Sequence, residues 1–382
     1  MKLRTLPIFL VFFVMGFGDV VGTLVGFVTK EFNLSSSLAG LLPFAGLIPF
    51  GLFAVPIGIL SDRKGKKFVL LSFLSIALIG LLIPSISIAE YYYVLIAIFM
   101  VGIGMCGLQV AGNPAMRDVS GEGKYSRNLT FAQFIKSIGT NTAPYVVPLI
   151  IFLGLAWQNI FLIYAVVVAL TLSAVIPIKL GASSEAKGLK SLASVRTSFS
   201  LLKIPRVALM VLGIFLYVGA EVGLNSWIAT YLQDRFGLNI ESLATLGIGF
   251  FLTSLVIGRL LGSIILNYLP PGKFFIISSL VGLAGILGMF MPSETIVIVF
   301  IFIAGIGFGN IFPLIFSILI DSMPERDNEL SGLLVMAIVG GAIVPAIMGV
   351  VAEWSIRLGF LIPVAIFIYL CFLAFYNMRY SK

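Results

Sequence analysis

Four ionisable side chains interrupt long apolar stretches of this sequence: Asp19, Lys136, Glu221 and Arg259. An ionisable group at membrane depth costs roughly 2.5–3.5 kcal/mol on insertion scales, so a group kept there is expected to have a role. A carboxylate that gains and loses a neighbouring cation can bind and release a proton. We therefore predict that Asp19, Lys136 and Glu221 take part in proton coupling.

Depth estimates at 1.5 Å per helical residue put Asp19 roughly 20 Å and Lys136 roughly 12 Å from the same end of their stretches. An ion pair between them is sterically possible if the two helices face each other. The alternative is a static pair that only joins the helices. Glu221 has no obvious cation at its level and could instead be a structural hydrogen-bond donor, while Arg259 is expected to brace an inner gate.

Uncharged polar side chains in the same stretches supply hydrogen-bond donors and acceptors of the kind that a hydroxyl-rich neutral solute requires, and Trp227 could stack on a sugar ring. The alternative for each amide is a hydrogen bond between helices, and for Trp227 a place in the core or at the membrane interface. The predicted substrate-binding residues are Gln109, Asn113, Gln133, Asn141, Asn225, Trp227 and Asn310.

The composition identifies the class of protein. Hydrophobic residues make up 60% of the chain and charged residues 10%, against about a quarter charged in soluble domains, which indicates a polytopic membrane protein. The chain has no histidine, which excludes a histidine proton relay or metal site, and its two cysteines, Cys106 and Cys371, lie in apolar stretches. We find no nucleophile–base pair and no metal-binding cluster, so neither enzyme activity nor a cofactor is expected.

Twelve apolar runs are long enough to cross a hydrocarbon core of about 30 Å. Because every backbone group must be satisfied within the bilayer, the runs are predicted to be helices. The predicted spans are 6–29, 38–60, 68–88, 91–116, 128–154, 157–179, 206–232, 242–266, 274–293, 295–320, 331–352 and 358–378.

The loops between these spans differ in charge. When alternate loops are assigned to opposite sides, nineteen of the 24 Lys and Arg residues fall on one side and three on the other. This bias predicts a multi-pass protein of the plasma (inner) membrane with both termini in the cytoplasm. The net charge of +8 thus follows from topology and requires no nucleic-acid partner.

The chain divides into two similar halves. A six-helix bundle is predicted over 1–180, a cytoplasmic central loop over 181–205 and a second bundle over 206–382. Gly139 and Pro144 recur as Gly340 and Pro345, and Asp19 recurs as Glu221, at offsets close to 202 residues. Parallel repeats of this kind imply a pseudo-two-fold axis along the membrane normal and a central cavity, as alternating access requires.

A short polar run, Gly58–Lys67, separates the second and third spans. Gly65 is expected to form a tight turn that holds Asp62 beside the next helix, where the cations from Arg63 onward can pair with it or with anionic lipids. The Gly-x-x-x-Asp-Arg-x-Gly-basic-basic spacing resembles the signature of the major facilitator superfamily. The resemblance implies a gating role for Gly58, Asp62, Arg63 and Gly65.

Longer stretches are similar to the fucose–galactose–glucose:proton symporter family. The resemblance implies that Gln133 and Asn113 line a sugar cavity and that Glu221 and Asn225 face it from the other half. The stretches that carry it are Phe32–Leu41, Gly107–Pro114, Arg127–Gln133, Tyr217–Glu221, Ile257–Gly262, Pro313–Ser317 and Leu334–Pro345.

Three positions depart from the fucose-transporting branch of that family. Gln109 stands where the branch has a glutamate, Gly22 aligns with its essential aspartate, and Lys136 aligns with an asparagine of its cavity. The proton mechanism of the branch therefore cannot be transferred directly. Either Asp19 has taken over the carboxylate's role, or coupling has moved to Glu221, or this chain couples differently.

The sequence as a whole predicts a monomeric secondary transporter that carries a sugar or sugar-like solute with a proton by rocker-switch alternating access. Three alternatives remain open. The first is a transporter of organic anions, including acidic sugars, with Lys136 as counter-charge. The others are an exporter of amphipathic drugs and a non-transporting receptor of the same fold.

Overall fold

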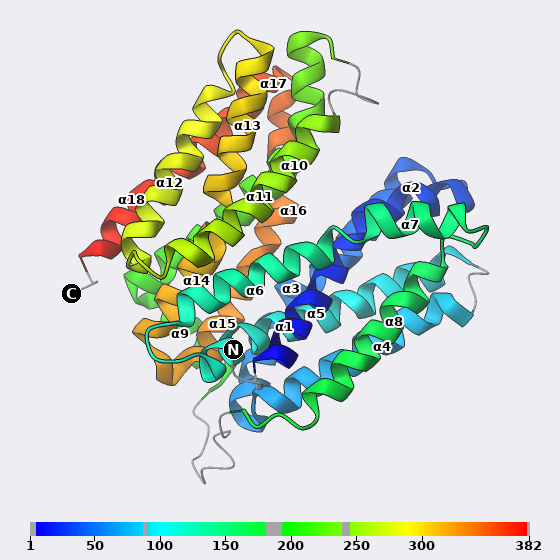
Figure 1. Cartoon of the computed structure of the whole chain (residues 1–382), viewed down its shortest axis with the longest axis vertical. Coiled ribbons are helices and arrows are strands. Elements are labelled where there is room, and N and C mark those ends of the chain that lie inside the picture. The colour runs from blue at the N-terminus through cyan, green and yellow to red at the C-terminus, as the bar shows by residue number, and fades with distance from the viewer. Residues whose placement is uncertain (1–4, 87–89, 181–192, 239–244, 380–382) are drawn as a thin grey trace. The chain divides into compact units, whose positions relative to one another are not determined.

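The computed structural model describes residues 5–86, 90–180, 193–238 and 245–379, and these residues form helices and no strands (Figure 1). The helices of the first part of the chain are α1 (Leu6–Met15), η1 (Gly16–Val20), α2 (Val21–Glu31), α3 (Ser36–Lys64), α4 (Lys66–Ile86), α5 (Tyr91–Val119), α6 (Tyr125–Thr140), α7 (Ala143–Phe152) and α8 (Asn159–Val175). The later helices are α9 (Val195–Ser200), η3 (Leu201–Lys203), α10 (Pro205–Phe236), α11 (Thr245–Ile265), α12 (Pro271–Gly288), α13 (Glu294–Phe308), α14 (Ile311–Ser322), η5 (Pro324–Arg326), α15 (Asp327–Met336), η6 (Ala337–Val339), α16 (Gly340–Ala352), α17 (Ile356–Gly359) and α18 (Leu361–Met378).

All twelve predicted spans correspond to a helix or to consecutive helices. By length and composition, eight helical spans of the described chain can cross a membrane, and α1 with α2 makes a ninth that is bent by 44°. The other three predicted spans correspond to α6 with α7, to α8 and to α11. Apolar side chains such as Phe152, Leu170 and Ile368 are exposed along these helices, as expected for surfaces that face lipid.

The helix breaks coincide with several of the polar residues. Asp19 lies in the 3₁₀ turn η1, Asn141 caps the end of α6, and Asn310 is the N-cap of α14. Short polar side chains compete for backbone hydrogen bonds and so favour such positions over helix interiors. Apolar length therefore predicted the spans but not the points at which they bend.

The central loop has more structure than we expected. Its first twelve residues, 181–192, lie outside the described part of the chain, but α9 and η3 follow within the predicted loop. The Ser194 hydroxyl accepts a hydrogen bond from the backbone N of Thr197 at 3.1 Å. This N-terminal cap explains why a short helix begins in a polar segment.

Contacts group the described residues into two compact units. The first comprises 1–125, 135–200 and 324–336, and the second comprises 126–134, 201–323 and 337–382. Each unit thus includes a short segment from the other half of the sequence. The segment 126–134 shifted by the internal offset of 202 residues gives 328–336, so the two exchanged segments are equivalent in the repeat.

Glycines allow close helix crossings at equivalent places in the two units. A Cβ atom on Gly139 would lie 2.1 Å from the backbone O of Phe13, and one on Gly340 would lie 2.0 Å from the backbone O of Phe215. Gly340 follows Gly139, and Phe215 follows Phe13, by close to the internal offset of 202 residues. The internal repeat therefore extends from sequence to backbone packing, with small residues at the crossings as in other membrane helix pairs.

Candidate functional site

The Asp19 carboxylate of the first unit contacts two residues of α6. The hydroxyl of Thr140 donates to Asp19 Oδ2 at 2.8 Å, and Lys136 Nζ lies 3.9 Å from the same oxygen. The Asp19 side chain is 49% exposed and the Lys136 side chain 17%. An ionic contact of this length and exposure is weak, which leaves the carboxylate able to exchange its partners.

The backbone around Gly16 brings these side chains together. A Cβ atom on Gly16 would lie 2.4 Å from both Lys136 O and Thr140 N, so only glycine allows the first span to approach α6 this closely. Residues three apart on a 3₁₀ turn lie on the same side, and Asp19 follows Gly16 by three within η1. Lys136 and Thr140 are four apart on a helix and share a face. The local folds of both segments therefore place these three side chains together.

Glu221 of the second unit has a cation partner. Arg259 Nη2 lies 3.1 Å from Glu221 Oε1, and Arg259 Nε donates to the backbone O of Gly309 at 3.2 Å. This ion pair corrects our expectation that Glu221 had no cation at its level. The depth estimate ignored the reach of the arginine side chain, which extends several ångströms along the helix.

Three of the predicted substrate-binding residues are used in helix packing. Asn310 is buried, and its Nδ2 donates to the backbone O of Gly258 at 3.0 Å. Asn141 donates to the backbone O of Ser137 at 2.8 Å and so closes the end of its own helix. Trp227 Nε1 donates to the backbone O of Pro345 at 3.2 Å. These contacts favour the alternative packing roles for all three residues.

The other four amides lie on helices of both units. Gln109 and Asn113 are buried on α5 in the first unit. In the second unit, Gln133 is buried on α6, and Asn225 on α10 is half-buried with an Oδ1 atom that has no hydrogen-bond partner among the described residues. Their contribution to a substrate site remains a prediction.

The predicted gating run forms the expected turn and a close packing surface. Gly65 separates α3 from α4 with φ of +91°, a conformation that L side chains rarely adopt. A Cβ atom on Gly58 would lie 2.6 Å from the backbone O of Asn328, and Ser61 donates to Asn328 Oδ1 at 2.8 Å. The end of α3 is therefore held against the start of α15, both within the first unit.

The charged residues next to this turn form a network. Lys66 Nζ lies 2.9 Å from Asp118 Oδ1 and 2.7 Å from Asp327 Oδ2, with little of the lysine exposed. Arg63 donates to the backbone O of Ala193 at 3.2 Å. Lys66 therefore joins the end of α5 to the start of α15. The residues that make these contacts at the ends of the helices form what we call the latch: Gly58, Ser61, Lys66, Asp118, Asp327 and Asn328.

Sequence reasoning missed the acidic partners of Lys66 and the role of Thr140. Asp118 and Asp327 lie 52 and 261 residues from Lys66 in sequence, so no local pattern joins them. Thr140, by contrast, follows Lys136 by one helical turn, and this spacing could have identified it.

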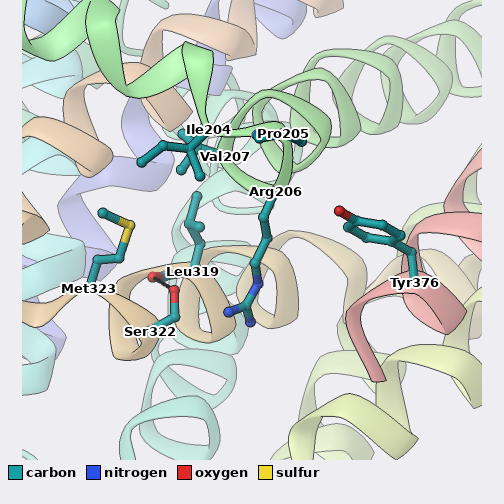
Figure 2. A pocket seen from close by; sticks show the side chains of 8 residues that line it. All are labelled: Ile204, Pro205, Arg206, Val207, Leu319, Ser322, Met323 and Tyr376. Atoms are coloured by element: carbon teal, nitrogen blue, oxygen red, sulfur yellow. Dashed lines mark hydrogen bonds between the residues drawn. The ribbon is translucent and has the colours of Figure 1, made fainter. Parts of the chain in front are cut away.

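A cavity of about 280 Å³ lies in the second unit, away from the residues discussed above (Figure 2). It lies between the start of α10, the end of α14 and the end of α18, and the Arg206 guanidinium extends into it between Ser322 and Tyr376 (Figure 2). None of the predicted site residues is among those that line it, which are Ile204, Pro205, Arg206, Val207, Leu319, Ser322, Met323 and Tyr376.

Comparison with known proteins identifies the family. Residues 8–338 match the profile of the Major Facilitator Superfamily. The chain belongs to this superfamily. The predicted fold, an all-α integral membrane protein with twelve transmembrane helices, is thereby confirmed, and so is the prediction that the chain is a transporter rather than an enzyme.

Individual members of the superfamily match over almost the whole chain. A glucose/galactose transporter of Brucella abortus (strain 9-941) is 30% identical over 389 residues, which cover 98% of this chain and 93% of that protein. An L-fucose-proton symporter of Escherichia coli is 23% identical over 353 residues, which cover 85% and 81%. The crystal structure of the fucose transporter FucP superposes with a TM-score of 0.86 over 97% of each chain at 20% identity. The last likeness supports the fold.

Proposed function

We propose that this chain imports a sugar or sugar-like solute together with a proton by rocker-switch alternating access. The relatives named as glucose/galactose transporter and L-fucose-proton symporter support the substrate class and the coupling ion. The observation that carries the coupling mechanism is the contact of Asp19 with Lys136 and Thr140. It puts a titratable carboxylate in the bent first span next to a cation and a hydroxyl of α6.

Asp19 is the proton-carrying group in this proposal. When it is ionised, the Lys136 ammonium and the Thr140 hydroxyl stabilise its charge. When it binds a proton, the attraction to Lys136 is lost, and the first span and α6 can shift relative to each other within their unit. Protonation is thereby linked to the packing of helices that face a transport pathway, as symport requires.

Glu221 is the second candidate for the proton-carrying carboxylate. Its pair with Arg259 is shorter than that of Asp19 with Lys136, and both side chains are less exposed than Asp19. The Arg259 guanidinium is also anchored to the Gly309 carbonyl. These contacts favour a structural role, in which the pair of Glu221 and Arg259 stabilises the second unit. Arg259 would then have a packing role in addition to any role in a gate.

The latch is proposed to hold the cytoplasmic side closed in one phase of the cycle. Its contacts fix α3 and α4 to α15, the start of the eleventh span, and α4 to the end of α5. In the orientation that the Lys and Arg distribution predicts, this end of the helices and both chain termini face the cytoplasm. Release of the latch would then open the pathway inward.

Recognition of the solute is assigned to amides rather than charges. Gln109, Asn113, Gln133 and Asn225 provide donors and acceptors that suit sugar hydroxyl groups. We propose further that the chain works as a monomer in the plasma (inner) membrane.

A second candidate is an organic anion, such as an acidic sugar. The observation that favours it is the Lys136 ammonium, whose ion pair within the described part of the chain is the 3.9 Å contact with Asp19. The ammonium could exchange that partner for a substrate carboxylate. In this alternative Lys136 is a substrate ligand. A variant with a neutral side chain at position 136 would then lose substrate binding rather than proton coupling.

Uptake into proteoliposomes tests both candidates. Fucose, galactose, glucose and galacturonate would be offered under an imposed pH gradient and then under a sodium gradient. Accumulation of a neutral sugar that follows the pH gradient, and that is lost in Asp19→Asn while sugar exchange persists, supports the proposal. Uptake of galacturonate alone, abolished in Lys136→Met, would establish the anion reading instead. Unchanged accumulation in Asp19→Asn would refute the assignment of the proton.

A further inference from the structure

We propose that Thr140 is a positioning residue for proton coupling, which holds the Asp19 carboxylate in both of its protonation states. This inference rests on the proposed role of Asp19. Thr140 Oγ1 lies 2.8 Å from Asp19 Oδ2, within the range of a strong hydrogen bond, whereas Lys136 Nζ is 3.9 Å from the same oxygen. The hydroxyl, rather than the ammonium, therefore makes the directional contact that orients the carboxylate.

The Thr140 hydroxyl has a second acceptor within reach. Its Oγ1 also lies 3.3 Å from the backbone O of Lys136, one turn earlier on α6. A hydroxyl group can donate one hydrogen bond and accept others. With Asp19 ionised, the hydroxyl hydrogen points to the carboxylate. With Asp19 protonated, the carboxylic acid donates to Thr140 Oγ1 and the hydroxyl hydrogen turns to the Lys136 carbonyl.

This exchange of partners keeps the carboxyl group bound throughout the cycle. Only the proton and the hydroxyl rotor move, and the carboxyl group keeps one hydrogen bond to Thr140 in each state. Valine has the shape of threonine but can take part in neither arrangement. Serine can take part in both, so the two substitutions separate the hydroxyl from the volume of the side chain.

Among the described residues, the elements near the carboxylate carry the titratable side chains of Lys136, Tyr164 and Cys106. Lys136 faces it from α6. Tyr164 of α8 stacks on Phe17 with ring centroids 3.8 Å apart, and its hydroxyl is bonded to Thr142. Cys106 of α5 is buried and follows Met105, whose Cγ atom would lie 2.9 Å from a Cβ atom on Gly18. Of these groups, Lys136 is the one charged near neutral pH, so a change at Thr140 is expected to act on Asp19 directly.

The test is the pH profile of gradient-driven uptake in proteoliposomes. Thr140→Val removes a charge-assisted hydrogen bond from the ionised carboxylate and a weaker, neutral one from the carboxylic acid, so the ionised form loses more stabilisation. The midpoint of the profile should move upward by about one pH unit. Thr140→Ser should reproduce the wild-type profile. Thr142→Val is the matched control, because Thr142 bonds Gly139 and Tyr164 and its loss should leave the midpoint in place.

Several outcomes would overturn the inference. A Thr140→Val profile that coincides with the wild type would do so, and so would an equal shift in Thr142→Val. Should Val at position 140 prevent folding, as judged by loss of sugar exchange, Thr140→Ala gives the same comparison. Failure of the proposed function is recognised separately, because Asp19→Asn would then still accumulate solute.

Discussion

Lys66 and Asp327, 261 residues apart in the sequence, form an ion pair in which Nζ lies 2.7 Å from Oδ2 and neither side chain is more than 10% exposed. Lys66 also bonds both carboxylate oxygens of Asp118. One ammonium group thus compensates two carboxylates where three helices meet. The arrangement stabilises the packing only while the lysine is present, because the two acids would otherwise repel each other.

Lys66→Met is therefore expected to destabilise the protein strongly. Removal of one partner from a buried ion pair costs about 3–5 kcal/mol, and a clear fall in the Tm of the purified protein should follow. Asp327→Asn should have a smaller effect, since Lys66 keeps Asp118. Lys67→Met, at the adjacent position, is the control. Equal Tm values for the variants at 66 and 67 would contradict the network.

The crossing of α3 and α15 depends on Gly58. In Gly58→Ala the new methyl group would meet the backbone O of Asn328 at 2.6 Å and the Cα of Gly332 at 3.3 Å. Overpacking of this kind typically costs about 1–3 kcal/mol, because backbone atoms cannot rotate away.

A thermal-unfolding measurement checks this prediction against a glycine of the same helix. A Cβ atom on Gly40 meets nothing within 4 Å, so Gly40→Ala should be neutral or slightly stabilising through its helix propensity. Equal stability of the variants at 58 and 40 would show that α3 and α15 do not need this close approach.

The equivalent crossings in the two units should respond alike to substitution. Gly139→Ala and Gly340→Ala each direct a methyl group at a backbone oxygen, that of Phe13 or Phe215. Each should lower the Tm, with a cost of about 1–3 kcal/mol or more. Gly249→Ala, where a Cβ atom meets nothing within 4 Å, serves as control. A lower Tm for only one of the two variants would mean that the two halves of the sequence repeat do not share this helix packing.

Sequence reasoning succeeded where the signal is local. Apolar length predicted the twelve spans, because burial in lipid acts on each helix separately. The turn at Gly65 followed from the spacing of its neighbours. Glycine adopts the positive φ that a tight turn needs, as Gly65 does beside Asp62 and the basic residues.

Prediction failed for the partners of Lys66, which lie on distant segments. The partnership of Lys66 with Asp118 and Asp327 depends on how helices meet and leaves no periodic pattern in any one of them. Asn310 and Trp227 illustrate a second difficulty. A polar side chain in a span can satisfy a neighbouring backbone carbonyl as readily as a solute, and only coordinates separate the two uses.

The two carboxylates can be distinguished by experiment. Glu221→Gln should lower stability by about 2–4 kcal/mol, because Arg259 would lose its counter-charge inside a span. Gradient-driven accumulation should nonetheless persist, since the proposed proton site is Asp19. The measurements are the Tm and the ratio of internal to external solute under a pH gradient.

A double-mutant cycle with Arg259→Gln completes this test. When both charges are removed together, no uncompensated charge remains in the span, so the double variant should be more stable than the sum of the single effects predicts. The coupling between the two positions should be about 1–3 kcal/mol. If Glu221→Gln instead abolished accumulation while stability and exchange were preserved, the proton would belong to Glu221, and the Asp19 pair would be the static one.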